Sequence, residues 1–139
     1  MTIQEIQDEI VDEFSMFEDW MQRYEYIIDL GKSLPLIDEQ YKTEDNIIKG
    51  CQSKVWVHAE QEGEEIVFTA DSDAILTKGI IAILIRAFSN QKAADILEAN
   101  TDFIDKIGLK EHLSPTRANG LVSMVKKIKM YALAFNAKN

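Results

Sequence analysis

Apolar residues at the start of the chain recur every three or four positions, the spacing of one face of an α-helix. The first such stripe is formed by Ile3, Ile6, Ile10, Val11 and Phe14. Ser15 and Glu18 have the spacing of a capping box, in which a hydroxyl and a carboxylate satisfy the first amides of a helix, so we predict that a second helix starts there. Gly31 and Pro35 are helix-ending signals, and residues 34–46 are predicted to form a connecting loop.

From Ser53 onward the period of the apolar residues changes to two, which is typical of a half-buried β-strand. The residues on the predicted buried face are Val55, Val57 and Ala59. His58 falls on the opposite face. A second alternating run, residues 65–70, follows a glycine-containing polar turn at residues 61–64. The sequence therefore predicts an antiparallel β-hairpin.

The most apolar stretch of the chain follows this hairpin. Residues 71–73, Asp-Ser-Asp, offer side-chain oxygens as N-caps for a helix from Ala74 to Phe88. This helix is apolar on most of its sides, which indicates that it lies at the centre of the core. Two short helical segments, residues 92–98 and 102–107, are predicted to come next.

The last helix is predicted to begin at Ser114 and Pro115, an N-cap residue followed by a proline at the first helical position. Its apolar stripe is Leu121, Met124, Val125, Ile128, Ala132 and Phe135. Gly120 lies in its first turns, where glycine is less favourable than alanine by up to about 1 kcal/mol. We therefore expect close packing, or a nearby surface, at Gly120.

The composition limits the class of protein and the class of partner. With 139 residues, of which 46% are hydrophobic, the chain is predicted to form one domain, residues 1–139. Its formal net charge of −9 repels phosphate backbones and anionic lipids, so neither nucleic acid nor a membrane surface is an expected partner. The longest apolar run, residues 79–85, is far shorter than the roughly 20 residues that span a bilayer. A protein or a small molecule is the expected partner.

Several kinds of chemistry find little support in the sequence. Structural zinc needs four Cys or His ligands, and the chain has one cysteine and two histidines. The glycines stand singly, so no phosphate-binding loop is predicted. A hydrolase would need His58 or His112 beside the cysteine, and nothing in the sequence favours either. One cysteine makes no internal disulfide and the N-terminus does not resemble a signal peptide, so we expect a cytoplasmic protein with a reduced thiol.

The single thiol, Cys51, lies in the stretch NIIKGCQSKVW, residues 46–56. A lone cysteine is commonly a small buried hydrophobe. Here, however, Gly50 removes a side chain beside the sulfur, and the segment joins a polar loop to a strand, so we predict a loop tip that another protein approaches closely. A nearby cation or helix N-terminus would favour the thiolate, and an apolar pocket would raise the pKa and protect the sulfur. Arg117 is either such a cation or an ordinary surface residue.

This stretch resembles the signature of the SufE/CsdE family of sulfur-acceptor proteins, which is built around Gly-Cys-Gln-Ser followed by Val-Trp. Similar blocks occur in family order along the chain, at residues 26–31, 71–74, 78–79, 112–117 and 120–121. The resemblance implies an α+β fold, in which a small antiparallel β-sheet packs against several helices, similar also to the IscU-type iron–sulfur scaffold. The helices and the hairpin predicted from the apolar pattern agree with this fold class.

The resemblance also implies a function. In this family the cysteine matching Cys51 accepts sulfane sulfur, as a persulfide, from a PLP-dependent cysteine desulfurase of the SufS type, stimulates that enzyme, and passes the sulfur on for iron–sulfur cluster assembly on a SufBCD-type scaffold. PLP belongs to the desulfurase, so the chain itself is expected to have no cofactor, and a sulfurtransferase-type carrier is expected to have no turnover alone. A single cysteine suits a carrier, because its sulfur cannot leave as an internal disulfide. The alternative is a docking module that activates a desulfurase or binds a scaffold without carrying sulfur.

The motif match extends to five further residues of the loop and of the partner-recognition surface. Gly50 permits close approach of a partner, and Gln52 and Ser53 are expected to hydrogen-bond the loop or the partner. By the same match Asp73 is expected near the cysteine loop. Arg117 is expected either on the recognition surface or beside the thiolate. Asp73 and Arg117 also suit the starts of their helices, where their role would be structural only.

Overall fold

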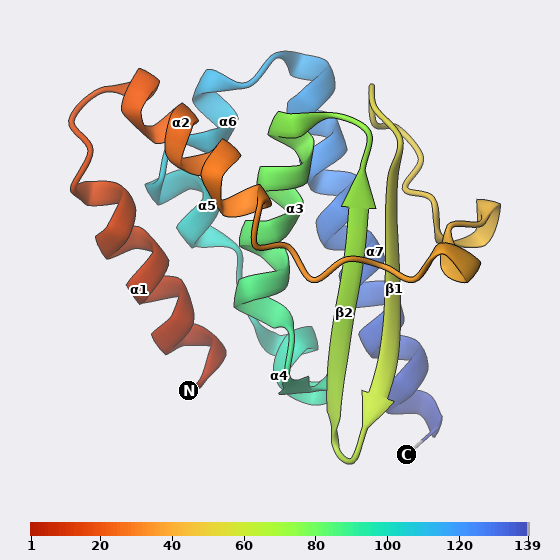
Figure 1. Cartoon of the computed structure of the whole chain (residues 1–139). Coiled ribbons are helices and arrows are strands. Elements are labelled where there is room, and N and C mark those ends of the chain that lie inside the picture. The colour runs from red at the N-terminus through yellow and green to blue at the C-terminus, as the bar shows by residue number, and fades with distance from the viewer. Residues whose placement is uncertain (139) are drawn as a thin grey trace.

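The structure, a computed structural model, describes residues 1–138 of the chain. The α-helices in this range are α1 (Ile3–Ser15), α2 (Trp20–Gly31), α3 (Ile75–Phe88), α4 (Ala93–Glu98), α5 (Asp102–Lys106), α6 (Leu109–His112) and α7 (Pro115–Lys138). The strands and 3-10 helices are η1 (Glu39–Tyr41), η2 (Glu44–Asn46), β1 (Val55–Glu62), β2 (Glu65–Ser72) and β3 (Gln91–Lys92). The predicted α+β fold with a small antiparallel sheet is confirmed (Figure 1).

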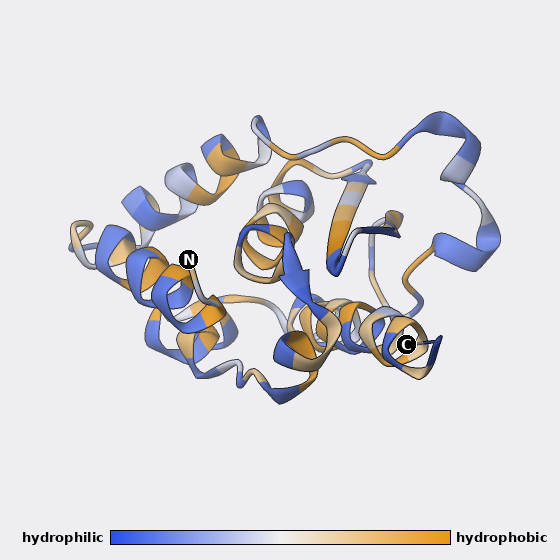
Figure 2. Cartoon of the chain, turned by 90° about the horizontal axis from the view of Figure 1, so that it is seen from below, coloured by the Kyte–Doolittle hydropathy of each residue, from blue (hydrophilic) through white to orange (hydrophobic). Residues whose placement is uncertain are grey.

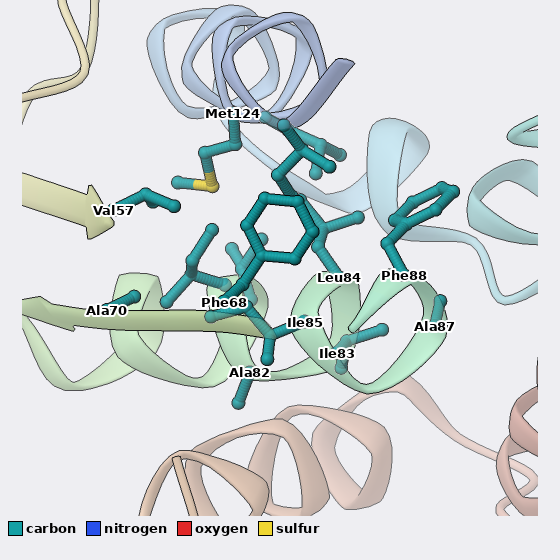
Figure 3. Close-up of a cluster of buried hydrophobic side chains, with 14 of the residues drawn as sticks. Val57, Phe68, Ala70, Ala82, Ile83, Leu84, Ile85, Ala87, Phe88 and Met124 are labelled. Atoms are coloured by element: carbon teal, nitrogen blue, oxygen red, sulfur yellow. The ribbon is translucent and has the colours of Figure 1, made fainter. Parts of the chain in front are cut away.

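The helix α3 lies at the centre of the molecule. Seen from below, it has α1 and α2 on one side and the sheet on the other (Figure 2). α7 runs alongside α3 and β1 and contributes Met124, which points toward Val57 in the core (Figure 3). Almost every residue of α3 is buried, because neighbours cover it on several sides. The near-continuous apolar sequence of this helix is explained by that position.

Two glycines let α2 and α3 cross with their backbones in contact. A Cβ at Gly31 would lie 2.9 Å from the backbone nitrogen of Gly79, and a Cβ at Gly79 would overlap the carbonyl group of Ile27. No side chain fits at that distance, so only glycine permits this crossing. The crossing fixes where α3 begins, and α3 provides part of the site described below.

The sheet has the order β1-β2-β3, and both pairings are antiparallel. β1 and β2 pair from Val55 with Ser72 to Glu62 with Glu65, and a two-residue turn joins them at Gly63, whose φ is +63°. A positive φ at this position suits glycine. The alternation along β1 buries Val55, Val57 and Ala59, as predicted. The strands are longer and the turn is shorter than expected.

The connection between α2 and β1 crosses the sheet on the face opposite α7 (Figures 1 and 2). It is held by a hydrogen bond from the amide of Ile37 to the carbonyl of Ala70, 3.0 Å, and by one from the amide of Ala70 to the carbonyl of Pro35, 3.0 Å. The predicted loop 34–46 is therefore anchored to β2. It also contains η1 and η2, which the sequence pattern did not indicate.

The predicted start of the second helix is wrong. Ser15 is the last residue of α1, where its hydroxyl donates to the carbonyl of Asp12 at 2.6 Å, and Glu18 makes no capping box. α2 begins at Trp20, and the carboxylate of Asp19 caps it by accepting from the amide of Gln22 at 2.8 Å. The sequence pattern indicated the hydroxyl of Ser15 as the N-cap oxygen. In the structure the carboxylate of Asp19, the residue directly before α2, has that role.

Three smaller expectations also require correction. The oxygens of residues 71–73 do not cap α3, whose N-cap is Ala74 without a side-chain bond, because Ser72 still belongs to β2. Lys92 pairs with Glu65 in β3 and precedes α4 instead of opening it. His112 ends the short helix α6, in a segment for which no helix was predicted. Within residues 1–138 no helix is both long enough and apolar enough to cross a membrane.

Candidate functional site

The loop between η2 and β1 lies at the end of the molecule where α3 and α7 begin (Figure 1). Cys51 is part of this loop. On the N-terminal side of this loop, the buried Ile48 donates its amide to the carbonyl of Val55, 2.8 Å. Tyr131 of α7 holds the same side, because its hydroxyl lies 2.6 Å from Oδ1 of Asn46 and 2.8 Å from the carbonyl of Val57. The sheet and α7 therefore fix the position at which the loop begins.

The other side of the loop is tied to the start of α3. The amide of Lys54 donates to the carboxylate of Asp73 at 3.0 Å, and the amide of Asp73 donates to the carbonyl of Lys54 at 3.2 Å. The hydroxyl of Ser72 donates to that carbonyl at 2.9 Å. Asp73 thus lies beside the Cys51 loop and bonds to it, instead of capping a helix. With both ends fixed, the tip of the loop is residues 49–53.

Gly50 adopts a conformation that other residues rarely adopt. Its φ is +88°, and a Cβ there would lie 3.2 Å from Oγ of Ser123 on α7. A positive φ strongly favours glycine, and the close approach to α7 adds a steric reason. Gly50 therefore turns the chain so that the next side chain, Cys51, faces inward.

The sulfur of Cys51 lies against the backbone of α7. Its thiol donates to the carbonyl oxygen of Gly120, with Sγ and O 3.7 Å apart. A Cβ at position 120 would lie 3.0 Å from Sγ, closer than nearly all Cβ contacts. The close packing expected at Gly120 is thus present, and the group packed there is the thiol itself. Cys51 is half-buried.

A small cavity adjoins the thiol. Its wall is formed by Cys51, Gln52, Ser53, Thr77, Ile80, Arg117, Gly120 and Met124. The free space is about 10 Å³, which is close to the volume that the centre of one water molecule needs. The cavity therefore has room for about one further heavy atom beside the sulfur.

Burial raises the pKa of the Cys51 thiol above its ordinary value. The neutral form is favoured, because an apolar surrounding disfavours the charged thiolate. The resting thiol is therefore a weak nucleophile and resists oxidation.

Arg117, which lines the same cavity, has a buried hydrogen-bond donor. Its Nε is fully shielded from solvent and has no hydrogen-bond acceptor within residues 1–138. A buried donor without an acceptor is unfavourable by about 1–3 kcal/mol. A persulfide anion within reach of Nε would supply an acceptor.

The structure brings the remaining predicted loop residues to the rim of the cavity. Gln52 is exposed and Ser53 is half-buried. Neither side chain hydrogen-bonds to any other residue in the described part of the chain, so both remain free to contact a partner.

The histidines lie elsewhere. His58 stacks on Tyr41 at 3.7 Å between ring centroids, and His112 stacks on Trp20 at 4.1 Å. Neither lines the cavity of Cys51, so no cysteine–histidine pair forms. Across residues 1–138, no group of three or more His, Cys, Asp or Glu side chains is arranged to hold a metal ion.

Some of the cavity wall was missed from sequence. Thr77, Ile80 and Met124 lie on stripes that predict a buried helix face, and nothing in the pattern separates a residue behind a thiol from any other core residue. Gly120 did give a signal, because a glycine in a helix requires a packing reason.

Comparisons with known proteins agree on one family. A family model described as the SufE Fe-S metabolism associated domain matches residues 8–132. A SufE-like protein of Rhizobium meliloti (strain 1021) is 42% identical over 130 residues, covering 90% of this chain and 93% of that protein. SufE-like protein 1, chloroplastic/mitochondrial, of Arabidopsis thaliana is 40% identical over 131 residues, covering 94% of this chain and 35% of that protein.

A solved structure shares the fold. The solution structure of a hypothetical protein from Thermus thermophilus matches with a TM-score of 0.77 and covers 93% of this chain and 94% of that chain. The two sequences are 18% identical, so this likeness concerns the fold alone.

Proposed function

Because the chain belongs to the SufE family, and so has a role in Fe–S metabolism, we propose that it is a sulfur carrier that holds sulfane sulfur as a persulfide on Cys51. The observation that carries the proposal is the position of the one thiol. Cys51 is on a loop tip, yet its sulfur points into a cavity with room for about one more atom, beside the unpartnered Nε of Arg117.

The sulfur donor in this proposal is a cysteine desulfurase of the SufS type, which carries a persulfide on its own cysteine. The Cys51 thiol loses its proton, and the thiolate attacks the outer sulfur of that persulfide. The sulfur–sulfur bond of the donor breaks, its cysteine leaves as a thiolate and takes up a proton, and Cys51 holds the new persulfide. One disulfide-type bond is exchanged for another, so no external oxidant or reductant takes part.

In this proposal the loop takes two positions, because the resting thiol lies half-buried against Gly120 and burial raises its pKa. With its sulfur inside, Cys51 is neutral and protected. For the attack, residues 49–53 swing outward between the two fixed ends of the loop, which exposes the thiol and lowers its pKa. After transfer, the sulfur returns to the cavity, where Nε of Arg117 donates to the persulfide anion.

The same chemistry then delivers the sulfur to an acceptor, for which a SufBCD-type iron–sulfur scaffold is the proposed partner. The chain itself uses no cofactor in this scheme, because PLP stays with the desulfurase, and it turns over nothing alone. A cytoplasmic or organellar compartment with reduced thiols suits an unpaired Cys51.

The test is the mass of the chain after exposure to an active desulfurase. The protein and its Cys51→Ser variant are incubated with cysteine and a PLP-loaded SufS-type enzyme without reductant, and both intact masses are measured. A mass gain of one sulfur on the wild type alone supports the carrier. No gain, while an established carrier in a parallel reaction is loaded, rejects it in favour of the docking module.

A further inference from the structure

The outer face of α7 carries apolar side chains that face solvent. The α7 stripe is defined here as Val122, Lys126, Met130 and Leu133, which share one face of the helix. Val122, Met130 and Leu133 are 42%, 63% and 59% exposed. A line of exposed apolar residues beside a functional site is typical of an interaction surface.

A groove of about 360 Å³ separates this stripe from the segment that leads into the Cys51 loop. Lys126 and Met130 line it from α7, and Ile47 and Lys49 line it from the opposite side. Ser123, which also lines the groove, is the residue that a side chain at position 50 would touch. The groove is therefore continuous with the Cys51 loop.

Three lysines line the groove, and none of them forms an ion pair with a described carboxylate. Ion pairs with carboxylates, at nitrogen–oxygen distances of 2.9 to 3.6 Å, occupy Lys32, Lys42, Lys78, Lys92 and Lys110. Among the residues that the structure describes, Lys49, Lys126 and Lys127 form no such pair, and neither do Lys54, Lys106, Lys129 and Lys138, which do not line the groove. Lys127 donates instead to the backbone carbonyl of Asp45 at 2.8 Å. Three ammonium groups thus stand without a neutralising carboxylate in a chain of net charge −9.

Two carboxylate residues also line the groove. Glu44 and Asp45 lie on the segment before the loop, and neither pairs with a groove lysine within residues 1–138. The α7 side therefore offers positive charge and an apolar side chain together. An acidic segment with an apolar residue is complementary to that combination.

We propose that this groove, together with the α7 stripe, is the docking site for an acidic segment of the desulfurase that loads Cys51. The inference rests on the proposed function. The carboxylates of the segment lie against Lys126 and Lys127, and an apolar residue of it packs on Met130. Docking beside the loop, and not on it, leaves residues 49–53 free to move while the donor stays bound.

The test compares two double variants with the same change of charge. Lys126→Glu/Lys127→Glu reverses the groove, and Lys32→Glu/Lys92→Glu reverses two lysines on other elements, each exposed. The rate of the desulfurase is measured against the concentration of each variant at low and at high salt. Thermal unfolding and intact mass confirm that both variants are folded and that the sulfur is on Cys51.

The groove variant is expected to need at least tenfold more protein for half-maximal stimulation, with the maximal rate and the final persulfide yield unchanged. The difference should shrink at high salt, because salt screens exposed charges. Met130→Ser should raise the same concentration severalfold without that salt dependence, and the control should stay within twofold of the wild type.

Equal half-maximal concentrations for both double variants would overturn the inference while leaving persulfide formation on Cys51 intact. The inference would also be overturned if the desulfurase loaded the groove variant normally and only the transfer of sulfur from it to the acceptor were impaired. The groove would then bind the acceptor and not the desulfurase. A change of oligomeric state in the groove variant would overturn it in favour of self-association. Failure of the wild type to gain sulfur is a different result, since it rejects the carrier itself.

Discussion

The sulfur of Cys51 and the backbone of Gly120 lie so close that a side chain at position 120 would meet the sulfur. Sγ is 3.7 Å from the carbonyl oxygen of Gly120 and would be 3.0 Å from a Cβ there. The two residues are 69 positions apart in the sequence. The first turns of α7 are therefore a wall of the sulfur site, and this explains a glycine where alanine would make a better helix.

Gly120→Ala is expected to push the thiol out of its cavity. The sulfur is the movable group in this contact, because it ends a short side chain on a loop. Cys51 should react with iodoacetamide severalfold faster than in the wild type, since its thiol becomes more exposed. The free energy of unfolding, measured in urea, should stay within about 1 kcal/mol, because the better helix former offsets the lost contact.

The control is Asn119→Ala, on the neighbouring exposed position of α7. It makes a comparable change of helix propensity without adding an atom beside the sulfur, so the alkylation rate should remain that of the wild type. An unchanged rate in Gly120→Ala would show that the loop absorbs the methyl group without moving Cys51.

The pH dependence of alkylation should report the burial of Cys51. Because burial raises its pKa, the folded protein should reach half-maximal reactivity at a higher pH than the same chain unfolded in urea. Folding therefore favours the neutral thiol. The stabilisation from this preference is fully present below the pKa of the unfolded thiol and is lost as pH rises through that of the folded one.

The Cys51→Ser variant separates the loss of stability caused by ionisation of Cys51 from the loss caused by other groups that titrate at alkaline pH. The serine variant should lose less stability than the wild type over that alkaline range, as measured by urea unfolding at several pH values. Identical pH profiles of alkylation for the folded and the unfolded chain would contradict the buried thiol.

The periodic parts of the fold were predictable, and the sulfur site was predictable only in part. The hairpin, α3 and α7 follow from regular apolar spacing. In these segments the local conformational preference and the burial of the apolar face favour the same structure. The start of α2 did not follow, because the pattern indicated Ser15, whereas Asp19 caps the helix. Phe17, in the intervening turn, packs on Tyr26 with ring centroids 5.0 Å apart, a contact that the local pattern does not contain.

The geometry of the site depends on contacts between distant segments, which no local pattern encodes. The sequence singled out Cys51 and Gly120 separately, by composition and by helix propensity, and gave no reason to place them together. Asp73 was assigned to a helix cap as one alternative, and its carboxylate in fact accepts from the amide of Lys54. The contact between Asp73 and Lys54 depends on the hairpin, because the pairing of β1 with β2 brings residues 54 and 73 together.

Asp73→Ala is expected to loosen the loop that carries Cys51. It removes the acceptor for the amide of Lys54 and leaves the backbone bonds of the hairpin in place. The free energy of unfolding should fall by about 1 kcal/mol, as for one hydrogen bond. Hydrogen exchange at Lys54 and alkylation of Cys51 should both become faster.

Asp73→Asn is the matched variant, because its side-chain carbonyl still accepts from that amide. It should lie between the wild type and Asp73→Ala in both exchange and alkylation. Wild-type exchange at Lys54 in the alanine variant would show that the carboxylate does not hold the loop.

Arg117→Met should separate the role of the guanidinium in the fold from its role toward sulfur. Because Nε has no acceptor in the resting protein, its loss breaks no hydrogen bond, and a methionine of similar length fills the space. The free energy of unfolding should therefore stay within about 0.5 kcal/mol of the wild type or rise, since a buried donor without an acceptor is unfavourable. The Cys51 persulfide, loaded by a desulfurase and then exposed to a thiol reductant, should be lost severalfold faster, because the anion lacks its donor in the cavity.

Arg117→Lys retains the positive charge without the Nε–H group, so a persulfide lost as fast as in Arg117→Met identifies the directed hydrogen bond as the stabilising element. A wild-type lifetime in Arg117→Met would contradict any contact between Arg117 and the persulfide.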